Sequence, residues 1–130
     1  MANKTFDLLG LIVEDEVVSV TASCTGANID GLALGDASYV AVINTNAPTG
    51  TVDGSNHYSL QLEASDAVGG TYVAVGNPVV TPVAASQAQV GFTAAQLEGL
   101  VASADFFRVT ATKVGTTATA VTYTSYISKI

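Results

Sequence analysis

The chain has 130 residues, a common size for one domain with its own core. Only 12% of its residues are charged, against roughly 25% in an ordinary soluble protein, so much of its surface must be uncharged. The net charge of -7 repels phosphate backbones and anionic lipid headgroups, so we expect neither nucleic acid nor a membrane as a partner.

Residues 1–15 contain more apolar side chains than an exposed tail should carry. The apolar stretch is short and runs into the acidic residues 14–16, so it fits neither a secretory signal nor a membrane span, and we expect synthesis in the cytoplasm. We predict that residues 1–15 form an arm that docks the remaining domain, residues 16–130, onto its partner. The alternative is an extra strand or short helix in the domain's own core. The predicted contact residues are Phe6, Leu8, Leu9, Leu11, Ile12 and Val13.

The first patterned strand is predicted from Val17 onward. Val18, Val20, Ala22 and Cys24 share one parity, which is typical of a half-buried strand. Because Cys24 has this inward parity and is the only cysteine, we expect a buried apolar residue and no disulfide framework.

Two stronger strands follow. Residues 39–43 are apolar on both parities, which predicts a central strand covered on both faces. Residues 58–65 alternate between apolar and polar side chains, which predicts a strand with one buried face. The glycine-containing turn at 66–70 predicts a hairpin into residues 71–75.

Two prolines restrict the secondary structure that the next part of the chain can form. Pro78 and Pro82 bracket a valine-rich stretch, which we place at a sheet edge or in a loop because proline cannot donate to a ladder. Val90 and Phe92 then indicate a short strand.

One short helix is predicted after residue 92. Thr93 has the profile of its N-cap, and Gln96 completes a capping box. Leu97, Leu100 and Val101 are predicted to share its apolar face.

The chain is predicted to end in two strands, residues 107–114 and 119–127, joined as a hairpin by residues 115–118. Frequent short strands with a single helical crossover favour an all-β fold. We therefore predict an antiparallel β-sandwich or small jelly roll with one short helix.

Candidates for catalytic chemistry are few. His57 lies in the turn-like stretch 53–57, and one histidine beside an aspartate matches no zinc or calcium motif. No nucleophile-elbow sequence supports serine hydrolysis. The acidic run 14–16 and the pair Glu63 and Asp66 are more typical of solvated strand and turn residues than of a catalytic carboxylate pair. We expect no catalytic residue, metal or cofactor.

Sugar recognition on a β-sandwich usually depends on aromatic side chains. The chain has no tryptophan, and Tyr58 and Phe107 have the parity of core residues. Tyr72, Tyr123 and Tyr126 remain as candidates for a binding face.

Three stretches together resemble the small β-sandwich cement proteins of tailed bacteriophage heads. They are residues 27–36 (ANIDGLALGD) leading into 39–42, residues 60–66 (LQLEASD) with 69–73 (GGTYV), and residues 106–110 (FFRVT) with Gly115 and the terminal strand.

This resemblance implies a virion structural protein, a capsid cement or decoration protein that binds the major capsid protein at the surface of the assembled head. It also implies a symmetric oligomer at local threefold positions, and scarce charge suits homomeric burial, so we expect a cyclic homotrimer. The resemblance supplies no catalytic residue, so we expect no enzymatic activity. The alternatives are a phage tail or fibre β-domain and a carbohydrate-binding β-sandwich.

Overall fold

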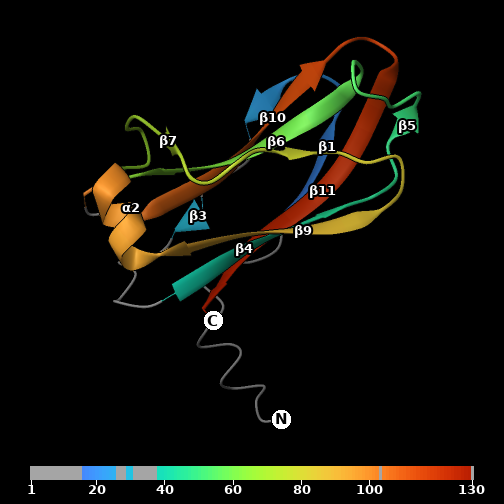
Figure 1. Cartoon of the computed structure of the whole chain (residues 1–130). Coiled ribbons are helices and arrows are strands. Elements are labelled where there is room, and N and C mark those ends of the chain that lie inside the picture. The colour runs from blue at the N-terminus through green and yellow to red at the C-terminus, as the bar shows by residue number, and fades with distance from the viewer. Residues whose placement is uncertain (1–15, 26–28, 31–37, 103, 130) are drawn as a thin grey trace, which may run out of the picture.

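The computed structural model describes residues 16–25, 29–30, 38–102 and 104–129, which form two antiparallel sheets and one short helix (Figure 1). The elements are β1 (Glu16–Val20), β2 (Cys24–Thr25), β3 (Ile29–Asp30), β4 (Ser38–Thr45), β5 (Thr49–Gly50), β6 (His57–Ser65), β7 (Val73–Ala74), β8 (Val79–Val80), β9 (Ser86–Thr93), α2 (Ala94–Leu100), β10 (Phe106–Val114) and β11 (Ala118–Lys129). The predicted all-β sandwich with one short helix is confirmed.

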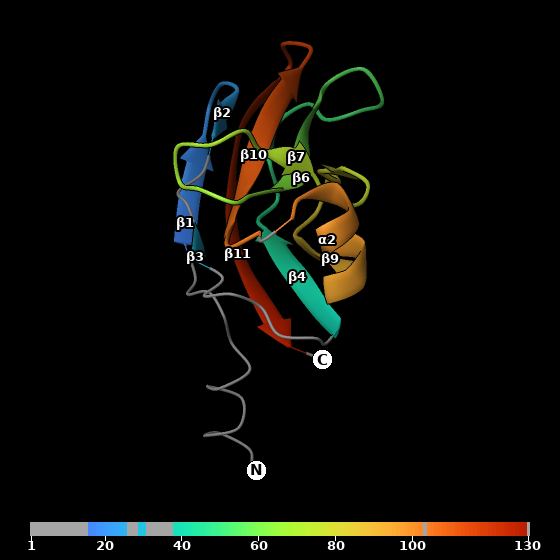
Figure 2. The ribbon, with the colours of Figure 1, turned by 90° about the vertical axis from the view of Figure 1, so that its left-hand side faces the viewer.

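Each sheet is built from strands that are distant in sequence. The first has the order β1-β11-β4-β9, with β5 beside β11. The second has the order β2-β10-β6-β7, with β3 beside β10 and β8 beside β6. Figure 2 shows β1 at one side of the domain and β9 with α2 at the other. Strands β1 and β9 are therefore the two outer strands of the first sheet.

The core lies between the inner faces of the two sheets. The second sheet contributes Tyr58, Leu60, Leu62, Ala64, Phe107, Val109 and Ala111, and the first contributes Tyr39, Ala41, Ile43, Val90, Phe92, Val121, Tyr123 and Ile127. These positions alternate along each strand, as strand geometry requires. The predicted burial of Tyr58 and Phe107 is confirmed, since both are 0% exposed.

Two tyrosine hydroxyls connect the sheets across this core. The Tyr123 hydroxyl donates to the Val109 carbonyl at 3.0 Å, and the Tyr58 hydroxyl donates to the Thr119 carbonyl at 3.2 Å. Buried hydroxyls need such partners, because an unpaired one costs several kilocalories per mole. The two rings are thus placed with their polar ends at the opposite sheet.

Several predicted elements are confirmed. Strand β4 lies between β11 and β9, and Val42, whose parity is opposite to that of the core residues Ala41 and Ile43, is also buried. Strand β7 pairs with β6 as the predicted hairpin, although it is only two residues long. The Val-rich stretch between the prolines contains β8, at the edge of the second sheet.

The capping box of α2 is formed as predicted. The Thr93 hydroxyl accepts from the Gln96 backbone N–H, and the Gln96 side chain accepts from the Thr93 backbone N–H. The predicted apolar face is only partly right, because Leu97 is buried and Val101 packs partly buried against the core, whereas Leu100, the last residue of the helix, is 48% exposed.

The single strand predicted from Val17 to Cys24 is wrong. Strand β1 ends at Val20 and pairs with β11, whereas Cys24 belongs to β2 and pairs with Ala111 of β10. The alternation of apolar and polar residues continues because both strands belong to the same sandwich. The chain nevertheless passes from the first sheet to the second between them. The side chain of Cys24 is not among those described, so its predicted burial stays a prediction.

The predicted terminal hairpin is also wrong. Strands β10 and β11 do not pair with each other, since β10 lies in the second sheet and β11 in the first. The turn between them crosses the end of the sandwich. Its backbone N–H groups at Thr116 and Thr117 donate to the side-chain oxygen of Asn56, at 3.0 and 3.2 Å. A contact with another loop therefore takes the place of the hairpin ladder.

Candidate functional site

Across β4, β9 and β11, the outer face of the first sheet has no acidic or basic side chain among the residues whose side chains are described. We call it the neutral face. In the described side chains of β4, β9 and β11 it consists of Val40, Val42, Asn44, Gln87, Gln89, Gly91, Thr122, Thr124, Tyr126 and Ser128, all of opposite parity to the core residues. No Asp, Glu, Lys, Arg or His occurs in β4, in β9 or in residues 118–128 of β11.

The residues of the neutral face form rows that run across the strands. One row places Tyr126 and Gln89 on the two sides of Val42. A second row places Thr124 and Gln87 on the two sides of Asn44. Residues opposite each other in antiparallel strands share a face, so a row with Tyr126 and Val42 lies beside a fully polar row.

The amides of the neutral face are connected by hydrogen bonds. The Gln87 side-chain amide donates to the Asn44 side-chain oxygen at 3.0 Å, and the Gln89 amide donates to the Gln87 oxygen at 3.3 Å. This ordering presents neutral donors and acceptors at fixed positions. Such groups form hydrogen bonds with a partner without the desolvation penalty of charges.

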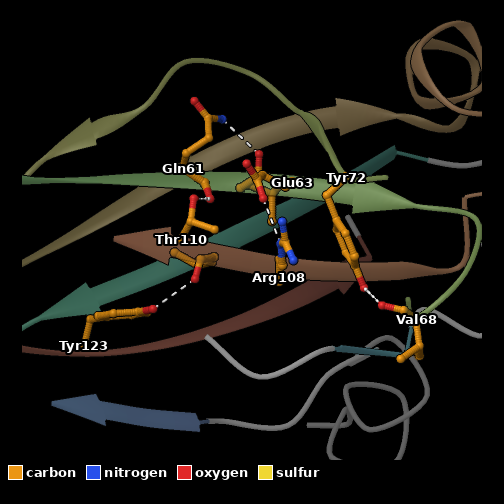
Figure 3. Close-up of polar contacts among 9 residues, drawn as sticks. Gln61, Glu63, Val68, Tyr72, Arg108, Thr110 and Tyr123 are labelled. Carbon is orange, nitrogen blue, oxygen red and sulfur yellow. Dashed lines mark hydrogen bonds and ion pairs between the residues drawn. The ribbon is translucent and has the colours of Figure 1, made fainter. Parts of the chain in front are cut away.

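The charged residues of strands with described side chains lie in the second sheet instead. The Arg108 Nε donates to the Glu63 carboxylate at 2.8 Å on its outer face, which confirms the outward parity predicted for Glu63. The Arg108 guanidinium also lies over the Tyr72 ring, 3.8 Å from its centroid (Figure 3). The Tyr72 hydroxyl donates to the Val68 carbonyl at 3.1 Å, so this cluster holds the β6–β7 loop against β10.

This cluster has a structural role, and its contribution to the free energy of unfolding is modest. The side chains of Arg108 and Glu63 are 28% and 20% exposed, and partly solvated pairs of this kind contribute about 1 kcal/mol or less. The guanidinium contacts both a carboxylate and a ring, so its position over Tyr72 is fixed from two sides.

Burial raises the pKa of Tyr72 above its ordinary value of 10.0, while the neighbouring Arg108 charge opposes the rise and Glu63 adds to it. A raised folded-state pKa means that this group's contribution to stability is fully present below the unfolded pKa and is lost as the pH rises through the folded one. We expect the wild type to lose stability above about pH 10 more steeply than Tyr72→Phe. Denaturant midpoints measured across this range for both proteins test it, and equal slopes would contradict it.

The stretch around His57 is a tight turn rather than a site. The Asp53 carboxylate accepts from the Ser55 backbone N–H at 2.8 Å and from the Asn56 side-chain amide at 3.0 Å, and these bonds lower the pKa of Asp53. The His57 Nδ1 lies 3.2 Å from the Asp53 carbonyl. Among the described residues no group of three or more His, Cys, Asp or Glu side chains has a metal-binding arrangement.

Asn56 is a residue that sequence reasoning missed. Its side chain both donates to Asp53 and accepts from the β10–β11 turn, so it connects two loops 60 residues apart in the chain. An asparagine in a turn is too common a signal to predict such a bridge. Asp66, the other acidic candidate, is exposed in the turn after β6, as predicted.

The aromatic candidates separate into buried and accessible rings. Tyr123 was predicted as available for a binding face, and this is wrong, since it is 1% exposed and its parity matches the core residues Val121 and Ile127. Tyr72 is half-buried beneath the Arg108 guanidinium. Tyr126 is half-buried on the neutral face beside Val42.

The predicted arm, residues 1–15, lies outside the described residues, and so do its contact residues Phe6, Leu8, Leu9, Leu11, Ile12 and Val13. Within the described part of the chain, no helix has the length and apolar character needed to cross a membrane.

Comparison with known proteins identifies the fold class. No protein-family model matches the chain, and no curated protein matches it either. Among solved structures it is similar to a CBM4 structure, with a TM-score of 0.51 and 16% identity over 88% of this chain and 82% of that one. The likeness places this chain among β-sandwich domains.

Two further solved structures have lower scores. One is the Clostridium thermocellum endo-1,4-beta-D-xylanase 10B CBM22-1–GH10 modules complexed with xylohexaose, with a TM-score of 0.49 and 8% identity over 93% of this chain and 28% of that one. The other is a chain of the capsid of Ralstonia phage GP4, with a TM-score of 0.39 and 16% identity over 91% of this chain and 84% of that one.

Proposed function

We propose that this protein is a virion structural protein, a capsid cement or decoration protein that binds the major capsid protein at the surface of an assembled phage head. The neutral face is the observation that carries the proposal. The sequence resemblance of residues 27–36 with 39–42, of 60–66 with 69–73, and of 106–110 with Gly115 and the terminal strand supports it. The proposal includes synthesis in the host cytoplasm and no catalytic step.

The neutral face is suited to burial against another protein. Charged residues are depleted at the centres of protein interfaces, because each buried charge must be desolvated and paired. Here the absence of charge extends over β4, β9 and residues 118–128 of β11, which are adjacent in the sheet. The second sheet, by contrast, has Glu63 and Arg108 on its outer face and is suited to remain in water.

The expected test substitution is Thr124→Glu, in the middle of the neutral face. It would bury an unpaired carboxylate in the contact, and we expect affinity for the shell to fall at least about tenfold, equivalent to about 1.4 kcal/mol. The matched control is Thr112→Glu, an exposed threonine on the outer face of β10. Co-sedimentation with heads assembled from the major capsid protein measures both, and equal binding by the two variants would refute the assignment of this face.

A carbohydrate-binding module is the second candidate, and one observation favours it. Tyr126 shares its cross-strand row with Gln89, and the neighbouring row contains Asn44 and Gln87, an arrangement of ring and neutral hydrogen-bonding groups that suits a sugar. The burial of Tyr123 and the covered ring of Tyr72 argue against it, because they leave few aromatic surfaces. Saturable binding on a glycan array, lost in Tyr126→Ala, would favour this function over a capsid contact.

Two expectations stay proposals. The arm residues Phe6 to Val13 are proposed to add to the shell contact. The cyclic homotrimer implied by the resemblance is proposed as the assembly on the head, where the shell brings three copies together.

A further inference from the structure

One side of the sandwich is formed by a long uncharged part of the chain. Residues 71–97 contain no Asp, Glu, Lys, Arg or His. They form β7 and β8, at the edge of the second sheet, and β9, at the edge of the first. A Cβ atom on Gly76 would lie 2.7 Å from Val90 Cγ1, so the β7–β8 connection approaches β9 and the two edges border the same side.

Strand β9 is an open edge. It pairs with β4 along all eight residues from Ser86 to Thr93, and no other described strand pairs with its other side. Open edges are usually blocked by a lysine, a proline, a bulge or a very short strand. Strand β9 has none of these, and its register with β4 is regular throughout.

An exposed valine precedes this edge strand. Val83, in the segment that leads into β9, is 70% exposed. Exposed apolar side chains beside an unpaired strand mark a surface that gains from being covered.

We propose that β9 pairs with β9 of a second copy of this chain, in antiparallel orientation about a twofold axis. The net charge of -7 makes two copies repel, and this uncharged side is where they can approach with least repulsion. The paired β9 backbones would join the first sheets of the two copies into one continuous sheet. This inference does not depend on what the neutral face binds.

The register follows from the side-chain pattern of β9. A twofold axis normal to the sheet keeps each residue on its own face, so an axis at Gln89 places Gln89 opposite its own copy and Ala88 opposite Val90. At the centre of this pairing the exposed Gln89 amide meets its own copy, and the inward residue Ala88 meets Val90. The central positions of the strand are therefore complementary to themselves.

Sedimentation of the full chain over rising micromolar concentrations tests the pairing. We expect a species of twice the 13.1 kDa chain mass, and Gln89→Lys is expected to weaken it at least about tenfold because two lysines would face each other across the axis. Thr124→Lys, on the same face but on β11, is the matched control and should dimerise normally. A monomer at all concentrations, a trimer, or equal dimerisation of both lysine variants would overturn the proposal.

A cysteine variant tests the register independently. With Cys24→Ser as the background, Gln89→Cys places two thiols opposite each other at a Cα separation of about 4.5–5.5 Å, within the span of a disulfide. Mild oxidation should convert this variant to a covalent dimer, while Thr124→Cys in the same background should stay uncrosslinked. Equal crosslinking of the two would contradict the pairing at β9, and circular dichroism confirms that each variant is folded.

Discussion

Replacing Phe107 with alanine is expected to lower the free energy of unfolding by about 3–5 kcal/mol. Phe107 is 0% exposed, and its ring centroid lies 5.7 Å from that of Phe92 on the opposite sheet. The substitution removes a ring that fills the space between the two sheets, and close-packed neighbours relax only partly into the resulting cavity. A loss of this size is a large fraction of the stability of a typical small domain.

The adjacent residue supplies the control for this prediction. Phe106 is half-buried and has the opposite parity, away from the core. Phe106→Ala removes the same side chain from the same strand, yet it should cost much less. Urea unfolding of both variants at one temperature measures the difference, and comparable losses would show that Phe107 is not a centre of the core.

Gly50→Ala is expected to cost about 2–3 kcal/mol. Gly50 has a φ of 84°, in the left-handed region that side chains with a Cβ rarely adopt. A Cβ there would overlap the Thr117 carbonyl oxygen and lie 2.9 Å from the Thr119 backbone nitrogen. Both contacts are with backbone atoms, which cannot rotate away. The strain of the left-handed backbone and the steric overlap therefore add.

Gly50 matters because β5 closes the end of the sandwich. Thr51 and Thr117 exchange hydrogen bonds beside it, with the Thr51 N–H donating to the Thr117 carbonyl at 2.9 Å and the Thr117 hydroxyl donating to the Thr51 carbonyl at 2.7 Å. The control is Gly54→Ala, because a Cβ at Gly54 meets nothing within 4 Å. Thermal unfolding should show a lower melting temperature for Gly50→Ala alone, and similar values for both would contradict the predicted strain.

Local patterns in the sequence determined the parts of the fold that depend on neighbouring residues. Alternation through residues 58–64 identifies the buried face of β6, because successive side chains of a strand point to opposite sides. The spacing of Thr93 and Gln96 predicts the start of α2, since both capping bonds lie within one turn. The scarcity of charge likewise indicates an uncharged surface somewhere on the domain.

Tertiary structure alone decided which strands distant in sequence became neighbours. A glycine turn such as the one at Gly115 serves equally for a hairpin and for a crossing between sheets, and here the contact with Asn56 goes with the crossing. Tyr123 and Tyr126 differ in parity, but only the packing of β11 over the second sheet decides which ring is buried. The neutral face and the open edge of β9 arise because β4, β9 and β11 meet in one sheet. Residues so far apart in sequence are brought together by burial of a shared core, a non-local interaction that no local pattern encodes.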